Sequence, residues 1–434
     1  MDDSTQSAVS GPEDVPAHHA LHRVSGPDEA LTAIVLGSRD VVVGRSPGPD
    51  GVAIEDARAS RAHAQLSRAP RRDLFLVRDL DSKNGVFVNG LRVTSRVLEV
   101  GDVVRIGDTL LVYEPVPASL DGSDEGSDVF VGLSSGARAV RRELVDAARA
   151  GASVLVSGET GTGKELVATL VHRRSGRGGP FHAVNCGAIP AGLAEAVFFG
   201  HRRGAFTSAE ADREGHLSAA DGGTLFLDEV AELPASAQAA LLRVLEDGVV
   251  VPVGATRGRS VDVRVIAATH ADLAKEVAGG RFRADLHARL ARWTLRIPAL
   301  RERRRDVLEI ARRRLRPGVS ITADASEALL CAPWPGNARE LISAVDRGQA
   351  LLHDRLRIDL ADLPAEIAAP IRHRASAPAA SAAPFERPSA AELMEALRES
   401  GGSVTRVAQQ LGRTRKQIYR WIEAHGLDLA RLRE

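Results

Sequence analysis

Short apolar runs rich in β-branched residues recur between about residues 30 and 115, and Gly, Asp and Asn separate them. The runs are TAIVL, DVVVG, DLFLVRDL, GVFVNG, DVVRIG and TLLVYE. Closely spaced strands divided by turn residues are typical of an all-β sandwich. We therefore expect an all-β domain over residues 29–115, behind a flexible tail over residues 1–28 that is rich in Gly, Pro, Ser and acids.

A different pattern follows an acidic linker at residues 116–128. Strand-like SVLVSG, TLFLDEV and VDVRVIAAT alternate with helix-like KELVATLVHRR and SAQAALLRVLEDG. Strand–helix alternation predicts a parallel α/β domain, here over residues 129–366. An Ala/Pro/Ser-rich linker at residues 367–388 leads to an all-helical segment at residues 389–434. The fold class is therefore multidomain: all-β, then α/β, then all-α.

Composition bounds the possible functions. The 434 residues suggest about two to four domains. Lys+Arg and Asp+Glu are 57 each, so DNA binding requires a local basic patch rather than a basic surface throughout. Two cysteines exclude a disulfide framework and suit a reducing compartment. No apolar run approaches the roughly 20 residues of a membrane helix, and the acidic N-terminus does not resemble a signal peptide. We expect a cytoplasmic protein with no membrane partner.

A phosphate-binding loop follows the strand-like SVLVS. Its motif GETGTGKE fits the P-loop pattern, in which backbone N–H groups face the phosphates and Lys164 reaches the β- and γ-phosphates. The candidate nucleotide-binding residues are Gly158, Glu159, Thr160, Gly161, Thr162, Gly163, Lys164 and Glu165.

About 65 residues after the P-loop, the apolar strand GGTLFLDEV ends in two acids. Asp228 would hold Mg²⁺ through water, and Glu229 would polarise the attacking water. Both motifs together predict an ATPase that uses ATP and Mg²⁺.

These motifs and several others resemble the AAA+ ATPase domain of bacterial sigma-54-dependent transcription activators. The additional segments are VNC, FFGHRRGAFTSA, GRFRADLHARL and WPGNARELI. The resemblance implies a P-loop ATPase domain with a helical lid, commonly assembled as a hexamer. In that family, VNC supplies an asparagine that couples the catalytic glutamate to the nucleotide state, which is Asn185 here.

The resemblance assigns roles to further positions. It implies that Arg283 and Arg289 serve the active site of the neighbouring subunit, and that Arg339 contacts the nucleotide. The alternative for Arg283 and Arg289 is that they are ordinary surface arginines. It also implies a loop that contacts sigma-54, formed by Gly204, Ala205, Phe206 and Thr207.

The chain departs from the family pattern at three positions. Ser208 and His270 stand where the family usually has glycine and asparagine, and Ser343 also replaces a usual asparagine. These departures motivate an alternative: a sigma-independent or hydrolysis-impaired DNA-binding regulator.

The last 45 residues predict a helix-turn-helix. Val404, Val407, Ala408 and Leu411 share one helical face, and Ile418, Trp421 and Ile422 share another, with a tight turn at Gly412. Residues 413–420 carry four positive charges and no acid. The segment resembles the Fis-like DNA-binding domain that ends this activator family, and a helical hairpin with a solvated basic face is the alternative. The candidate DNA-contacting residues are Thr414, Arg415, Lys416, Gln417, Tyr419 and Arg420.

The all-β region resembles a forkhead-associated (FHA) domain. The matching segments are Gly44-Arg45, the Ser60-Arg61-x-His63 loop and SKNG-x-x-x-NG from Ser82 to Gly90. That resemblance implies a phosphothreonine site formed by Arg45, Ser60, Arg61, Lys83 and Asn84. His63 and Asn89 are expected to fix loops. The alternative is a sandwich that only packs on the ATPase.

Together these observations predict an ATP-dependent regulator that binds upstream DNA, senses phosphothreonine and remodels sigma-54 RNA polymerase holoenzyme. The expected partners are that holoenzyme, upstream DNA, a phosphothreonine-bearing protein or its kinase, and further copies of this chain, from dimer to hexamer. A phosphopeptide-binding adaptor is the remaining alternative.

Overall fold

The computed structural model describes residues 19–28, 30–69, 74–116, 129–206, 209–372 and 390–400, together with residues 404, 407, 408, 418, 421, 422, 425 and 427. The chain divides into two compact units, Met1–Ala380 and Ser381–Glu434. In these described ranges, no helix is both long enough and apolar enough to cross a membrane.

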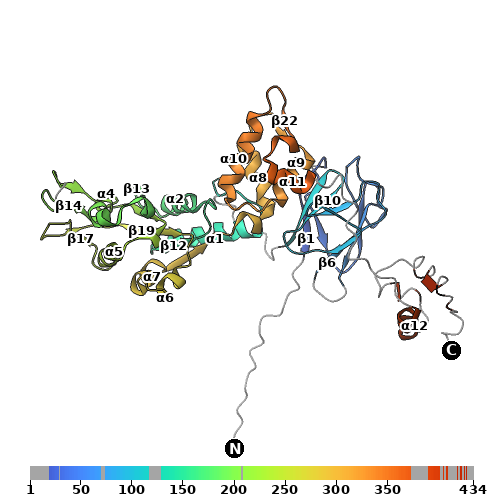
Figure 1. Cartoon of the computed structure of the whole chain (residues 1–434), viewed down its shortest axis with the longest axis horizontal. Coiled ribbons are helices and arrows are strands. Elements are labelled where there is room, and N and C mark those ends of the chain that lie inside the picture. Colours follow the sequence, from blue (N-terminus) through green and yellow to red (C-terminus); the bar gives the residue numbers. More distant parts are fainter. Residues whose placement is uncertain are drawn as a thin grey trace, which may run out of the picture. The chain divides into compact units, whose positions relative to one another are not determined.

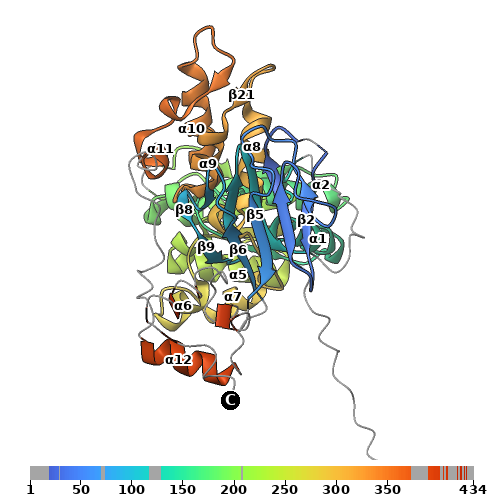
Figure 2. The ribbon, with the colours of Figure 1, turned by 90° about the vertical axis from the view of Figure 1, so that its right-hand side faces the viewer.

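The first unit begins with a sandwich of two mostly antiparallel sheets. Their orders are β2-β1-β11-β10-β7-β8 and β4-β3-β5-β6-β9, and Figure 2 shows β5, β6 and β9 side by side. The side chains between the sheets are buried and apolar, as the short apolar runs predict. The strands are β1 (His19–Ser25), β2 (Ala33–Leu36), β3 (Val41–Gly44), β4 (Val52–Ala53), β5 (Ala64–Arg68), β6 (Phe75–Asp79), β7 (Val86–Val88), β8 (Leu91–Val93), β9 (Ser95–Val97), β10 (Val103–Ile106) and β11 (Thr109–Pro115).

Strand β1 corrects the expected flexible tail over residues 1–28. His19–Ser25 pairs with both β11 and β2, so the sandwich begins within that segment. The physical reason is burial: Ala20 and Leu21 are fully buried, and Leu21 belongs to the sandwich core. A short apolar strand inside a polar N-terminal segment is easily missed.

The α/β domain is built on a parallel sheet of order β13-β16-β19-β12-β20. Helices pack against it, so its strands carry nearly continuous apolar runs; all six residues of β19 are buried. The carboxyl ends of β12, β16 and β19 meet at one edge, which is where ligands bind in such sheets. The strands are β12 (Val154–Ser157), β13 (Phe181–Asn185), β16 (Thr224–Asp228), β19 (Arg264–Thr269) and β20 (Trp293–Arg296).

Helices and short hairpins surround this sheet. Helix α1 begins after Ser134, whose hydroxyl accepts a hydrogen bond from the N–H of Ala137, and ends at left-handed Gly151. The elements are α1 (Ser135–Ala150), α2 (Lys164–Arg174), η1 (Cys186–Ala188), η2 (Ala191–Leu193), α3 (Ala194–Phe199), β14 (Gly200–His201), β15 (Arg213–Glu214), α4 (His216–Ala219), η3 (Val230–Glu232), α5 (Ala235–Asp247), β17 (Val249–Val250), β18 (Arg259–Ser260), α6 (Leu273–Ala278) and α7 (Ala284–Leu290).

A mostly helical lid follows. It consists of η4 (Leu300–Glu302), η5 (Arg304–Asp306), α8 (Val307–Arg314), β21 (Ser320–Ile321), α9 (Ala323–Cys331), α10 (Asn337–Ala350), β22 (Arg357–Ile358), η6 (Leu360–Asp362) and α11 (Ala365–Arg372). Helix α11 corrects the expected end of this domain at residue 366. Ile367 and Ile371 lie in the lid core, so the folded region continues through Arg372.

The sandwich packs against the lid. Figure 1 shows the sandwich beside the lid helices α9 and α11. Val24, Val103, Leu110 and Val112 of the sandwich belong to the same apolar cluster as the lid side chains. Arg105 of β10 crosses this interface, and its NH1 group donates to Glu327 Oε2 at 2.7 Å and to Asp324 Oδ1 at 2.5 Å, both on α9.

Glu114 at this interface predicts a pH dependence of stability. Burial raises the pKa of Glu114 to about 7, although Arg305 lies 3.9 Å away. Between pH 4.5 and 7 the folded chain holds a proton that the unfolded chain has released, so stability falls as the pH rises over this range and the loss is complete above about pH 7. A Glu114→Gln variant is expected to gain about 2 to 3 kcal/mol over wild type at pH 8 and nothing below pH 4.5.

Thermal unfolding of both proteins from pH 4.5 to 8.5 measures this difference. Glu99→Gln, at an exposed position, serves as the control. Parallel pH profiles for wild type and Glu114→Gln would contradict the prediction.

The second unit contains α12 (Ala390–Glu399) and isolated described positions beyond it. Leu393 and Leu397 of α12 pack with six further buried side chains. These are Ala396, Val404, Val407, Ala408, Ile418 and Ile422. The predicted apolar faces are thus confirmed at the described positions, whereas Leu411 lies outside them.

Candidate functional site

The P-loop connects the end of β12 to the start of α2. Gly161 has φ +79°, and a Cβ there would lie 2.2 Å from the carbonyl oxygen of Gly336 in the lid. The Gly161 carbonyl also accepts a hydrogen bond from the Ala338 N–H at 3.1 Å. Only glycine allows the loop and the lid to approach this closely.

Lys164 is the first residue of α2, and its side chain is buried. Its ammonium donates to the Gly158 carbonyl at 3.0 Å and lies 3.6 Å from Glu229 Oε1. The charge is therefore held between the P-loop and the end of β16. This is where the phosphates of a bound nucleotide would need a positive charge.

Asp228 and Glu229 lie at the carboxyl end of β16, as predicted. Burial raises the pKa of Asp228, and the neighbouring Glu229 charge adds to this effect. Burial acts the same way on Glu229, but a hydrogen bond from His270 and the Lys164 charge outweigh it, so its pKa is lowered. Glu229 also takes a left-handed backbone conformation, with φ 53°. A strained residue of this kind is common at functional sites.

His270 holds Glu229. Its Nδ1 lies 2.7 Å from Glu229 Oε2, and because a carboxylate can only accept, Nδ1 carries the proton. Asn185 and Glu229 line one cavity, and the Asn185 Oδ1 accepts a hydrogen bond from the Gly187 N–H at 3.0 Å. The histidine at the departure from the family pattern thus contacts the predicted catalytic glutamate directly.

Glu159 of the P-loop bonds to the lid rather than lining the cavity beside Lys164. Arg301 donates to both of its oxygens, at 2.8 and 2.6 Å, and Asn337 Nδ2 donates at 3.1 Å. These hydrogen bonds lower the pKa of Glu159 to about 2. We call Glu159, Arg301 and Asn337 the P-loop latch. Motif reasoning did not find the two lid members of the latch.

A cavity of about 600 Å³ opens at this edge of the sheet. It combines the P-loop, the two acids at the end of β16 and a lid arginine, so at least three separate segments of the chain contribute to it. Its lining includes Thr160, Gly161, Gly163, Lys164, Glu165, Asn185, Asp228, Glu229 and Arg339. Glycines with positive φ, a buried lysine and an arginine suit the polyphosphate of a nucleotide, so these residues fit ATP.

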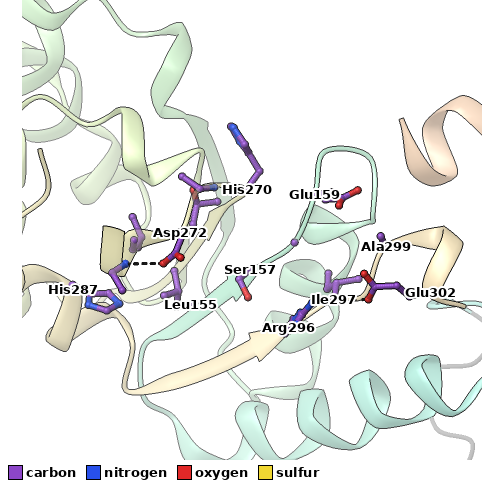
Figure 3. Close-up of a pocket in the computed structure, with 15 residues that line it drawn as sticks. Leu155, Ser157, Glu159, His270, Asp272, His287, Arg296, Ile297, Ala299 and Glu302 are labelled. Carbon is purple, nitrogen blue, oxygen red and sulfur yellow. Dashed lines mark hydrogen bonds and ion pairs between the residues drawn. The ribbon is translucent and has the colours of Figure 1, made fainter. Parts of the chain in front are cut away.

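A second cavity of about 480 Å³ shares the first residues of the P-loop, Gly158 and Glu159. Figure 3 shows its charged lining, with Asp272, His287, Arg296 and Glu302 around Ser157. The His270 side chain extends away from these residues, which agrees with its contact to Glu229. The P-loop lysine is not among its lining residues. The chemistry of phosphate binding therefore lies in the first cavity.

Arg283 and Arg289 do not line the nucleotide cavity of their own chain. Arg283 is exposed and forms a bidentate ion pair with Asp285. Its Nε donates to Oδ1 at 3.0 Å and its NH2 group donates to Oδ2 at 2.7 Å. Arg289 donates to the Leu245 carbonyl at 3.2 and 2.9 Å. The structure thus brings neither arginine to Lys164 within one chain.

The loop between β14 and β15 contains the predicted sigma-54 contacts. The Gly204 N–H donates to the Ala209 carbonyl at 2.8 Å, and Ala205 lies beside Gly254. The Phe206 ring is half-buried, 4.8 Å from the His201 ring. Thr207 and Ser208 lie outside the described residues.

A cationic cavity of about 780 Å³ lies on the sandwich loops. It is lined by all five predicted phosphothreonine residues and by Arg58, which sequence reasoning missed. The charged and polar lining residues are Arg45, Arg58, Ser60, Arg61, Lys83 and Asn84. Four cations without an acid among the lining residues favour an anionic ligand.

Local contacts shape this cavity. A Cβ at Gly44 would lie 2.3 Å from the Arg61 carbonyl oxygen, so glycine is required beside the loop. His63 is buried, accepting from the Ser60 N–H at 3.0 Å and donating to the Gly85 carbonyl at 3.1 Å. Asn89 bonds to Asp102 and Val103. His63 and Asn89 therefore fix loops, as expected.

The predicted DNA-contacting residues of the second unit lie outside the described residues. They are Thr414, Arg415, Lys416, Gln417, Tyr419 and Arg420.

Comparisons with known proteins agree with this arrangement. Four families match, in chain order: the FHA domain at residues 41–107, the sigma-54 interaction domain at 130–296, the AAA+ ATPase lid domain at 301–380 and the Fis family of bacterial regulatory proteins at 386–425.

Individual relatives match most of the chain. The response regulator PilR of Pseudomonas aeruginosa is 42% identical over 321 residues, 69% of this chain and 70% of PilR. The transcriptional regulatory protein GlrR of Escherichia coli K12 is 40% identical, over 65% of this chain and 64% of GlrR. The chain thus spans about two thirds of the length of these relatives.

A solved structure shares the fold. NtrX from Brucella abortus in complex with ADP is 31% identical, with a TM-score of 0.52 over 68% of this chain and 70% of that chain. NtrX was also solved in complex with ATP. With its ATP-binding AAA+ domain, its FHA domain and its Fis-type helix-turn-helix, the chain belongs to the family of sigma-54-dependent transcriptional activators.

Proposed function

We propose that this protein binds upstream DNA and uses ATP hydrolysis to remodel sigma-54 RNA polymerase. Phosphothreonine binding to its sandwich domain controls this activity. The observation that carries the proposal is the convergence of Lys164, Asp228 and Glu229 at one edge of the parallel sheet. A phosphate-binding cation beside two carboxylates is the arrangement that hydrolysis of a phosphoanhydride uses.

Each residue has a separate role in hydrolysis. Lys164 exchanges its bond to the Gly158 carbonyl for the nucleotide phosphates. Glu229, held by His270, orients the attacking water and accepts its proton. Asp228 would hold Mg²⁺ through water, and the ion would neutralise developing phosphate charge. Mg²⁺ commonly takes one or two carboxylates plus phosphates, so a cluster of three protein ligands is not needed.

Arg283 and Arg289 complete the site of a neighbouring subunit. Arg283 is exposed and lies outside its own nucleotide cavity, as a residue acting on another subunit would be. An arginine at the γ-phosphate stabilises the charge of the transition state. Turnover therefore requires assembly, which we propose reaches a hexamer.

The remaining parts set the input and the output. Gly204, Ala205, Phe206 and Thr207 contact sigma-54, and the basic segment at residues 413–420 binds upstream DNA. The cationic cavity of the sandwich binds phosphothreonine on a partner protein or a kinase. A Ser/Thr kinase thus supplies the signal.

An open-complex assay tests the proposed function. Purified protein, ATP and sigma-54 holoenzyme are expected to open a promoter carrying an upstream site for this protein, whereas a non-hydrolysable ATP analogue is not. ATP hydrolysis without promoter opening would overturn the sigma-54 step and support the sigma-independent regulator.

Arg45→Ala is expected to weaken binding of a phosphothreonine peptide by a factor on the order of 10 to 100, because it removes a charge-assisted hydrogen bond to the phosphate. Titration calorimetry with peptides selected from a phosphothreonine library measures this loss. Arg39→Ala removes the same charge from an exposed position outside the cavity and should bind as wild type does. Equal affinities for Arg45→Ala and wild type would place the phosphate elsewhere.

A further inference from the structure

A continuous series of polar contacts joins the cationic cavity of the sandwich to the ATPase lid. Arg58 lines the cavity, and its NH1 group donates to Asp108 Oδ1 at 3.2 Å. The same oxygen accepts from Arg105 NH2 at 3.1 Å. Arg105 in turn donates to Glu327 and Asp324 of lid helix α9. One carboxylate oxygen is therefore shared by a cavity residue and an interface residue.

The Asp56 side chain reinforces this connection. Asp56 is buried, and its Oδ1 accepts from the Arg58 N–H at 2.9 Å. Its Oδ2 accepts from the Asp108 N–H at 2.7 Å and from the Thr109 hydroxyl at 2.9 Å. The cavity loop and the β10–β11 turn are thus held together. Displacement of Arg58 would therefore change the contacts of Asp108.

Arg58 can pair with either of two anions, the Asp108 carboxylate or a bound phosphate. Its side chain is 56% exposed and Asp108 is 36% exposed, so their contact is easily exchanged. A phosphothreonine carries about −1.5 to −2 charge and three strong acceptor oxygens, which makes it a stronger partner for a guanidinium than one shared carboxylate oxygen. Predicted phosphate ligands, including Arg45, line the same cavity.

We propose that Arg58 is a switch residue that pairs with Asp108 when the cavity is empty and with the phosphate when phosphothreonine is bound. Asp108 then has Arg105 as its remaining arginine partner and competes with Glu327 and Asp324 for it. The contact between the sandwich and α9 loosens. This inference rests on the proposed phosphothreonine binding. It identifies the lid as the part of the chain that responds to that binding.

The lid can pass this change to the nucleotide cavity. Arg339 of α10 lines that cavity, and the residues just before and at the start of α10 touch the P-loop at Gly161. Helices α8, α9 and α10 share one apolar cluster, so movement of α9 is transmitted to α10. We expect the KM for ATP to respond to the phosphopeptide.

The test uses the full chain and the tightest-binding phosphothreonine peptide of a library, with its unphosphorylated form as the control. Amide hydrogen exchange in α9 and the KM for ATP are measured with and without peptide. In wild type, saturating phosphopeptide is expected to speed α9 exchange by about tenfold or more. The unphosphorylated peptide is expected to change neither quantity.

Two variants separate the steps. Asp108→Asn removes the competing charge, so it should bind the phosphopeptide at least as tightly as wild type, yet the peptide should no longer alter α9 exchange or KM. Arg58→Gln should bind about tenfold more weakly and, once saturated, also leave α9 unchanged. Loss of the effect in both variants, with folding checked by thermal unfolding, supports the switch.

Three results would overturn it. Binding in wild type without any change in α9 would reject the switch and leave the proposed phosphothreonine binding intact. A full peptide effect in Asp108→Asn would show that coupling takes another route. Absence of phosphopeptide binding in wild type would reject the proposed binding function and the switch together.

Discussion

A Glu229→Gln variant is expected to hydrolyse ATP about 10² to 10⁴ times more slowly than wild type, the range expected for loss of a general base. The amide keeps the size of the side chain and can still hydrogen-bond to His270, but it cannot accept the proton of the attacking water. Because the phosphate-binding contacts of Lys164 and the P-loop remain, the affinity for ATP should change little. Steady-state phosphate release and nucleotide titration measure the two quantities separately.

Glu143→Gln provides the matched control. Glu143 is an exposed residue of α1, and it does not line the nucleotide cavity. The same chemical change there should leave turnover as in wild type. Unchanged turnover in Glu229→Gln would show that Glu229 does not act in the catalytic step. Asp228 would then be the acid to test.

An Arg105→Met variant is expected to detach the sandwich from the lid. Arg105 and Glu327 are each 1% exposed, so the substitution leaves a buried carboxylate without its cation. Burial lowers the pKa of Arg105, but Glu327 and Asp324 outweigh this effect and raise it. Breaking such a pair costs about 3 to 5 kcal/mol. Amide exchange in α9 should accelerate by a factor on the order of 10² to 10³, without any peptide.

The double variant Arg105→Met/Glu327→Met should recover most of the lost protection, because two apolar side chains replace the pair without an unpaired charge. Arg314→Met is the control. Its exposed partner Asp346 remains solvated, so α9 exchange should match wild type. Wild-type exchange in Arg105→Met itself would show that this ion pair does not hold the domains together.

Much of the fold could be predicted because its signals are local. The apolar run before GETGTGKE, the loop and the following helix lie within about 20 consecutive residues, and a P-loop is by nature a strand–turn–helix segment. The acids after TLFL fall at the same edge of the sheet because parallel strands all end there. Likewise, the loop motifs of the sandwich gather into the cationic cavity because short turns join adjacent strands.

The parts that could not be predicted depend on contacts between distant segments. Arg105 and Glu327 are separated by 222 residues, and Glu159 and Asn337 by 178. No periodicity or spacing links such pairs. One signal did exist: an arginine inside the buried run VVRI requires a partner for its charge. Arg58 was missed for another reason, because its role depends on a neighbouring turn and not on its own motif.

The P-loop latch has a consequence for the energetics of nucleotide binding. With a pKa near 2, Glu159 stays ionised at every physiological pH, and Arg301 and Asn337 keep it anchored. The loop therefore loses its conformational freedom when the chain folds rather than when ATP arrives. Nucleotide binding then carries little ordering entropy. Discrimination between ATP and ADP can consequently depend on the γ-phosphate contacts and not on how well each nucleotide organises the loop.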